Sequence, residues 1–208
     1  KLSQLNIESK FVEGLRVSNK DVVKIAQDVF IEFNKEILNE LKNHSVSARS
    51  ITSKENNIIN VKAISEELGF VGTPYTIDVD VLKKIVKVNE VPIIAPLGLN
   101  SKNQVHNVNA DDIATFVASS LNARRLIIIS DVAGVMDKDN NLISEINSSK
   151  VKEMIKKGEI SGGMQVKLNS AINISHKVKG TVIISGKKTR SLLFELLSDS
   201  GAGTLIRK

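Results

Sequence analysis

The feature that most constrains the fold is an uninterrupted apolar run, LIII at residues 126–129, which ends at Ser130. A strand with one face in water alternates apolar and polar side chains, whereas a strand covered on both faces carries apolar side chains throughout. The run therefore predicts a parallel strand covered on both faces. Residues 91–96, VPIIAP, predict a second buried strand, and residues 181–184, TVII, predict another strand.

Helical patterns separate these strands. Apolar residues recur at helical spacing along residues 20–43, directly after Ser18 and Asn19, which suit a helix N-cap. Further helices are predicted at residues 78–87, 111–121, 148–157, 164–176 and 190–197, further strands at 46–51, at 58–61 and after Thr204, and a loop at 97–104. This alternation predicts an α/β fold, a three-layer αβα sandwich with a central, mainly parallel sheet. We expect two lobes, residues 1–110 and 111–208.

Composition narrows the classes of function. The formal net charge is +6, but the lysines are spread along helical segments and aromatic residues make up only 3% of the chain, so no nucleic-acid partner is expected. With no Cys and three scattered His, no metal site is expected. No apolar run approaches the roughly 20 residues of a membrane span, and no leader is apparent, so we expect a cytoplasmic protein without membrane contact.

Parallel α/β sheets bind ligands where their strands end at the carboxyl side. The polar run NVNADD, residues 107–112, follows the strand near Ile93 and offers amide donors and carboxylates at the start of a helix. Asn side chains can hold a ligand's carboxylate and amide group at once. The alternative is a plain loop with a helix cap.

Three other segments carry unusual residues. The turn SDVAGVMD at residues 130–137 follows the most apolar strand, and Gly134 permits a close backbone approach to a ligand, although an ordinary surface loop has the same pattern. Residues 160–167, ISGGMQVK, place paired glycines and Lys167 near a helix start, which suits the binding of a polyphosphate. The alternative is an ordinary loop that ends in a solvated Lys. Residues 11–17, FVEGLRV, set Arg16 among apolar neighbours, where its guanidinium could clamp a carboxylate through two hydrogen bonds. An ordinary exposed Arg on an edge strand is the alternative.

Together and in this order, these segments resemble the amino-acid kinase family, and within it the branch that phosphorylates the side-chain carboxylate of N-acetyl-L-glutamate with ATP, a step of arginine biosynthesis. The resemblance runs across essentially the whole chain. It implies that Arg16, Asn107 and Asn109 bind the acceptor, that Lys167 neutralises the transferring phosphoryl group, and that Asp111 holds the catalytic lysines. The residues that it implies for nucleotide binding are Ser130, Asp131, Val132, Gly134, Val135, Gly163, Met164 and Lys167.

The resemblance also implies a cofactor, an effector and an assembly. It implies ATP with Mg²⁺ held mainly by the nucleotide, and N-acetylglutamate as the other substrate. The segment LFELLSDSGAGT at residues 193–204 is similar to that of arginine-inhibited members, in which Glu195 and Gly201 would contact the effector. A homodimer or a trimer of dimers is implied as the assembly.

The chain also departs from the family pattern. The family begins with a strand that carries a Lys before paired glycines, followed by a second Gly-rich turn, but the only Gly-Gly pair here is Gly162-Gly163, and residues 50–54 lack the glycines of an equivalent turn. We expect a fragment of a longer enzyme without its N-terminal glycine-rich segments, which binds ligands better than it turns them over. The alternatives are a catalytically silent ligand-binding module, or a related kinase with another acceptor, such as an aminoadipate derivative on a carrier protein.

Overall fold

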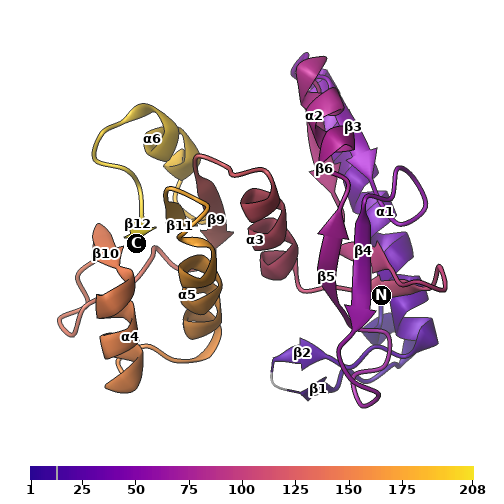
Figure 1. Cartoon of the computed structure of the whole chain (residues 1–208), viewed down its shortest axis with the longest axis horizontal. Coiled ribbons are helices and arrows are strands. Elements are labelled where there is room, and N and C mark those ends of the chain that lie inside the picture. Colours follow the sequence, from indigo (N-terminus) through magenta and orange to yellow (C-terminus); the bar gives the residue numbers. More distant parts are fainter. Residues whose placement is uncertain (13) are drawn as a thin grey trace. The chain divides into compact units, whose positions relative to one another are not determined.

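The computed structural model describes residues 1–12 and 14–208 (Figure 1). The chain divides into two compact units, Lys1–Ile113 and Ala114–Lys208. That residues 1–110 form an acceptor-binding lobe and residues 111–208 a nucleotide-binding lobe stays a prediction. Among the described residues, no helix is both long enough and apolar enough to cross a bilayer.

The described residues of the first unit form three sheets. Its elements are η1 (Ser3–Leu5), β1 (Phe11–Val12), β2 (Leu15–Arg16), α1 (Lys20–Asn43), β3 (Ala48–Ile51), β4 (Ile59–Ala63), β5 (Gly72–Ile77), α2 (Val79–Lys87), β6 (Val91–Ile94), β7 (Leu97–Leu99) and β8 (Val105–Asn107). The sheet orders are β5-β4-β7-β8, β3-β6 and β1-β2, and the pairs β3–β6 and β4–β7 are parallel. Helix α3 (Ala110–Ser120) begins in this unit and ends in the second.

Helix α1 packs against β3, β6 and β8 (Figure 1). It begins where the side chain of Asn19 accepts a hydrogen bond from the backbone amide of Val22 at 2.9 Å, as an N-cap does. Its inner face includes Asn34, which is only 4% exposed and donates to Ser50 Oγ at 3.1 Å and to the carbonyl of Ile93 at 3.0 Å. A buried amide is tolerated because it is bonded, and it ties the helix to the β3–β6 pair.

The second unit is built on one four-stranded sheet of order β10-β12-β11-β9. Its elements are β9 (Leu126–Ser130), β10 (Glu145–Asn147), α4 (Ser148–Lys156), α5 (Gly162–Ile174), β11 (Thr181–Ser185), α6 (Ser191–Leu197) and β12 (Thr204–Arg207). Strands β9 and β11 run parallel, and β12 is antiparallel to β11. Ile128 and Ile183 pack on one face of the sheet against Met154 of α4 and Leu168 of α5. The opposite face contributes Val182 and Ile184 to a smaller cluster.

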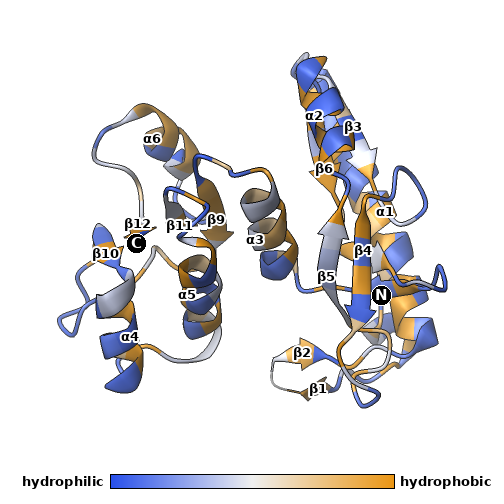
Figure 2. Cartoon of the chain, in the orientation of Figure 1, coloured by the Kyte–Doolittle hydropathy of each residue, from blue (hydrophilic) through white to orange (hydrophobic). Residues whose placement is uncertain are grey.

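The α/β class and the order of the long helices are confirmed, and the parallel pairing of β9 is confirmed as well. Full burial of this strand is wrong: β9 lies at an edge of the described sheet and Ile129 is 58% exposed, although Figure 2 colours the strand as apolar. The strand with every residue buried is β11. Strand β11 is more buried than β9 because it lies between β9 and β12, whereas β9 has a neighbouring strand on one side only.

Other differences arise where short strands lack a pattern of their own. The strands predicted at residues 46–51 and 58–61 exist as β3 and β4; β3 pairs with β6, and β4 pairs with β5 and β7. The predicted loop 97–104 contains β7, and β5 was not predicted because its sequence GTPYTI includes Gly and Pro, which disfavour strand interiors. Among the described residues, the strands pair in four sheets, in which β3–β6, β4–β7, β9–β11 and β10–β12 are parallel.

Candidate functional site

Three segments that are distant in the sequence lie side by side in the first unit. Ser18 forms a parallel bridge with Gly69, and Val71 forms one with Asn107. The amide of Ser18 donates to the carbonyl of Leu68 at 3.0 Å, and its carbonyl accepts from the amide of Phe70 at 2.7 Å. The amide of Asn107 donates to the carbonyl of Phe70 at 2.9 Å. Phe70 therefore joins the backbone near Arg16 to the polar run at residues 107–112.

The side chains of this group are connected as well. Asn107 Nδ2 lies 3.4 Å from Ser18 Oγ, and Ser18 Oγ donates to the carbonyl of Arg16 at 3.0 Å. The Arg16 guanidinium donates to Ser9 Oγ and stacks 4.6 Å from the centre of the Phe11 ring. The structure thus links the backbone of Arg16 to Asn107, while the guanidinium rests on its own hairpin. Glu13, within the segment at residues 11–17, lies outside the described residues.

Asn109 caps helix α3. Its Oδ1 accepts from the amides of Asp111 at 2.8 Å and Asp112 at 3.3 Å, so the helix-cap interpretation holds for this residue. Both acids lie in the first turn of α3, where negative charge suits the helix dipole. Burial, and in addition the charge of Asp111, raise the pKa of Asp112 above its ordinary value.

The residues predicted to bind a nucleotide line one cavity in the second unit, of about 520 Å³. The lining residues are Ser130, Asp131, Val132, Gly134, Val135, Met136, Glu159, Ile160, Ser161, Gly163, Met164 and Lys167. Met136, Ile160 and Ser161 lie within the singled-out segments, residues 130–137 and 160–167, but were not among the predicted nucleotide-binding residues. Glu159, which stands just before the second segment, was missed as well. Glu159 pairs with Lys138 at 3.2 Å, which brings the two loops around the cavity together.

The turn after β9 depends on contact with β12. Thr204 Oγ1 accepts from the amide of Val135 at 2.8 Å and donates to the carbonyl of Ile143 at 2.6 Å. Gly134 has φ +150°, and a Cβ there would lie 2.4 Å from Thr204 Oγ1. Glycine is required because a side chain would occupy the position of the Thr204 hydroxyl.

The glycine pair forms the first turn of α5. The helix begins at Gly162, two residues earlier than predicted, where the amide of Gln165 donates to the carbonyl of Ser161 at 3.5 Å. Gly162 itself takes φ +59°, a left-handed conformation that glycine adopts without strain. The first amides of a helix have no partner within it, so they are available to an anion. Lys167 follows in the second turn, and a Cβ on Gly163 would meet no atom within 4 Å. The arrangement presents backbone donors and a cation to the same cavity.

The two residues predicted to bind an effector line another cavity, of about 550 Å³. Glu195 is 6% exposed; Oε1 accepts from Arg125 at 2.8 Å and Oε2 accepts from the amide of Ala202 at 3.0 Å. Gly201 has φ +66°, and a Cβ there would lie 2.9 Å from Glu195 Oε2. The structure therefore brings both residues together, and it gives the carboxylate an internal guanidinium partner, Arg125, that sequence reasoning missed.

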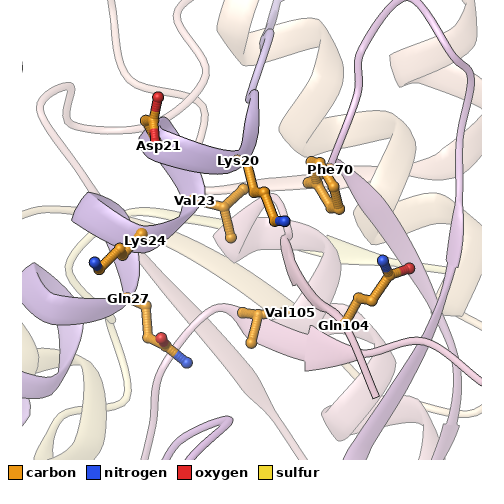
Figure 3. Close-up of a pocket in the computed structure, with 8 residues that line it drawn as sticks. All are labelled: Lys20, Asp21, Val23, Lys24, Gln27, Phe70, Gln104 and Val105. Carbon is orange, nitrogen blue, oxygen red and sulfur yellow. The ribbon is translucent and has the colours of Figure 1, made fainter. Parts of the chain in front are cut away.

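A further cavity, of about 450 Å³, lies beside the first two turns of α1 (Figure 3). Its lining residues are Lys20, Asp21, Val23, Lys24, Gln27, Phe70, Gln104 and Val105. Figure 3 shows Lys20 and Val23 pointing inward, with Phe70 and Val105 facing them, whereas Asp21 points away. No sequence pattern marked this cavity, because its residues come from three separate segments.

The sequence of the chain is similar to a known family and to named enzymes. The model of the amino acid kinase family matches residues 1–185. The acetylglutamate kinase of Pelagibacter ubique (strain HTCC1062) is 54% identical over 209 residues, which cover 100% of this chain and 73% of that protein. The acetylglutamate kinase of Campylobacter fetus subsp. fetus (strain 82-40) is 37% identical, with 99% of this chain and 75% of that protein covered.

Solved structures agree on the fold. A crystal structure from Streptococcus mutans UA159 matches with a TM-score of 0.85 and 27% identity, covering 99% of this chain and 80% of that one. N-acetylglutamate synthase from Neisseria gonorrhoeae, complexed with coenzyme A and N-acetyl-glutamate, matches with a TM-score of 0.90 over 99% of this chain and 48% of that one. At 21% identity the second likeness concerns the fold alone.

Proposed function

The chain belongs to the amino acid kinase family, and we infer that it catalyses the reaction of its acetylglutamate kinase relatives, the ATP-dependent phosphorylation of the side-chain carboxylate of N-acetyl-L-glutamate in arginine biosynthesis. The observation that carries this inference is 54% identity to one of these enzymes across the whole chain. The cytoplasmic location and the assembly into a homodimer or a trimer of dimers stay predictions.

The nucleotide is proposed to bind in the cavity between the turn after β9 and the start of α5. The amides of the first turn of α5 would face the phosphates, and Lys167 would add a full positive charge beside them. Ser130 Oγ donates to Asp131 Oδ1 at 3.2 Å, which orders the rim of the cavity where the rest of the nucleotide would lie.

Magnesium is proposed to enter with ATP. Among the described residues, no group of three His, Cys, Asp or Glu side chains could hold a metal ion. The cavity does offer carboxylate oxygens, from Asp131 and Glu159, and Mg²⁺ commonly combines one or two carboxylates with phosphate oxygens and water. When bound, the ion would neutralise charge on the phosphate oxygens.

The acceptor is proposed to bind at the group formed by Arg16 and Asn107. A carboxylate nucleophile is already ionised at pH 7, so the reaction needs no strong base, and alignment and charge neutralisation should provide most of the acceleration. We propose that the Arg16 guanidinium exchanges Ser9 for a carboxylate of the acceptor. Asn109 would act by capping α3, and Asp111, in the first turn of that helix, would hold the catalytic lysine in place by charge.

The proposed function is tested by measuring ATP consumption with N-acetylglutamate, glutamate and aspartate as alternative acceptors, together with calorimetric binding of each. We expect binding and turnover with N-acetylglutamate to exceed those with the other two, because Asn107 can meet both an amide and a carboxylate. Equal values for all three would contradict the assignment of the acceptor. Binding of N-acetylglutamate and ATP without turnover would favour the silent module.

Inhibition by arginine is proposed at the cavity beside Glu195 and Gly201. A buried carboxylate is a natural partner for a guanidinium, and Glu195 already holds one from Arg125. We expect added L-arginine to lower turnover, with Glu195→Gln much less sensitive and L-lysine without effect as a control ligand. A flat response to arginine would exclude this effector.

A further inference from the structure

Ser18 is buried and hydrogen-bonded through both its backbone and its side chain, which no sequence pattern predicted. It is 0% exposed, and its backbone is bonded on both sides to the strand-like segment at Leu68 and Phe70. Gly69 lies between these two residues with φ +68°, and a Cβ there would lie 2.7 Å from the Ser18 carbonyl oxygen. The same segment receives the amide of Asn107 through the Phe70 carbonyl. Ser18 and Asn107 therefore share one backbone support.

The hydroxyl of Ser18 fixes the orientation of the Asn107 side chain. A hydroxyl has a single proton, and Ser18 Oγ donates it to the carbonyl of Arg16 at 3.0 Å. Toward Asn107 the oxygen can only accept, so the atom 3.4 Å away must be the amide nitrogen Nδ2. The contact is long, as such bonds often are before a substrate binds. The carbonyl oxygen Oδ1 is then turned away from Ser18.

This orientation matters for an acceptor with an amide and a carboxylate on one carbon. The Asn107 amide can accept from the acceptor's N–H through Oδ1 and donate to its carboxylate through the second proton on Nδ2. If the Asn107 amide were rotated by half a turn, its oxygen would face the acceptor's carboxylate and its N–H groups would face the acceptor's N–H. Both contacts would then be unfavourable, so one hydrogen bond from Ser18 controls two contacts with the ligand.

We propose that Ser18 is a positioning residue for the acceptor: it sets the orientation of the Asn107 amide and so selects an N-acylated amino acid. The proposal rests on the proposed function, because it takes Asn107 as an acceptor ligand. Ser18 touches Arg16 and Asn107 and acts through them; it is not itself a catalytic residue.

The test compares dissociation constants by isothermal titration calorimetry for N-acetylglutamate and for ATP. We expect Ser18→Ala to weaken N-acetylglutamate binding about tenfold and to leave ATP binding unchanged. Ser18→Thr, which keeps the hydroxyl, should restore binding to within about threefold of the original value. Thr76→Val, which removes another hydroxyl of the same unit that accepts from an asparagine amide, Asn60 Nδ2 at 3.0 Å, should change neither constant.

A double-mutant cycle separates positioning from general loosening of the unit. Ser18→Ala combined with Asn107→Ala should bind N-acetylglutamate no more weakly than Asn107→Ala alone, because the orientation of an absent amide has no effect. The proposal would be overturned if the double mutant weakened N-acetylglutamate binding by the product of the two single-mutant effects. Unchanged binding in Ser18→Ala would overturn it as well. If Ser18→Ala does not fold, Ser18→Cys replaces it, and binding equal to the original protein's would again overturn the proposal.

The proposed function and the positioning proposal fail in different ways. Unchanged N-acetylglutamate binding in both Asn107→Ala and Arg16→Ala would refute the acceptor site itself. Weak binding in Asn107→Ala with normal binding in Ser18→Ala would leave the acceptor site intact and refute only the role of Ser18.

Discussion

Replacing Lys167 with Ala is expected to lower kcat by about 10²- to 10³-fold, the usual effect of removing one group that stabilises transition-state charge. Lys167 lines the candidate nucleotide cavity from the second turn of α5, on the helix whose first amides have no partner within the helix. Charge is redistributed among the oxygens around the reacting phosphorus during transfer, and a cation placed to stabilise that charge should affect turnover more than ground-state binding. The dissociation constant for N-acetylglutamate should stay within about threefold of the original value.

Two variants serve as comparisons for Lys167→Ala. Arg16→Ala should have the opposite profile, with acceptor binding weakened and turnover at saturating acceptor nearly kept, because a ground-state contact is lost. Lys177→Ala removes the same charge from an exposed position of the same unit and should change neither quantity. Similar changes in both constants for Lys167→Ala and Arg16→Ala would show that the proposed division of roles is wrong.

Replacing Gly203 with Ala is expected to lower the free energy of unfolding by about 3 kcal/mol, measured by urea unfolding followed by circular dichroism. A Cβ at this position would lie 1.9 Å from the carbonyl oxygen of Ile183, which is backbone of the fully buried strand β11 and cannot move aside cheaply. The next residue, Thr204, pairs with Ile183 and holds the turn after β9 through its hydroxyl. ATP binding should therefore weaken along with stability.

The matched control for Gly203→Ala is Gly163→Ala. A Cβ on Gly163 meets no atom within 4 Å and the residue has no positive φ, so Ala should be accepted in α5 and can stabilise the helix by up to about 1 kcal/mol. A loss of stability in Gly163→Ala equal to that in Gly203→Ala would mean that the close approach of β12 to β11 is not what requires glycine. Unchanged stability in Gly203→Ala would contradict the geometry directly.

The candidate nucleotide site was predictable because its residues follow strand ends or helix starts in short, continuous segments. Ser130 is the last residue of β9 and Gly134 lies in the turn after it, and Gly163 and Lys167 come in the first two turns of α5. The topology of an α/β sheet brings such segments to one edge. Glu159 lines the same cavity, but it stands outside both segments, and only the fold brings its side chain to the cavity.

The acceptor group was only partly predictable. Arg16 and Asn107 were recognised individually, but the contact that joins them passes through Ser18, which is 89 residues from Asn107 in the sequence and was predicted only to suit a helix cap. Asn19 has that capping role instead. The direction of the Arg16 guanidinium, toward Ser9 and Phe11, depends on the β1–β2 hairpin and could not follow from its apolar neighbours.

By itself the sequence determined the α/β class, the long helices such as residues 20–43 and the segments that carry chemistry, because helical periodicity and capping act over a few neighbouring residues. Only the tertiary structure decided which strands pair, that Ile129 lies at an edge, that Thr204 holds the turn at Gly134 and that Asn107 Nδ2 lies beside Ser18 Oγ. These contacts join residues far apart in the chain. Their formation depends on how whole elements pack, which no local pattern encodes.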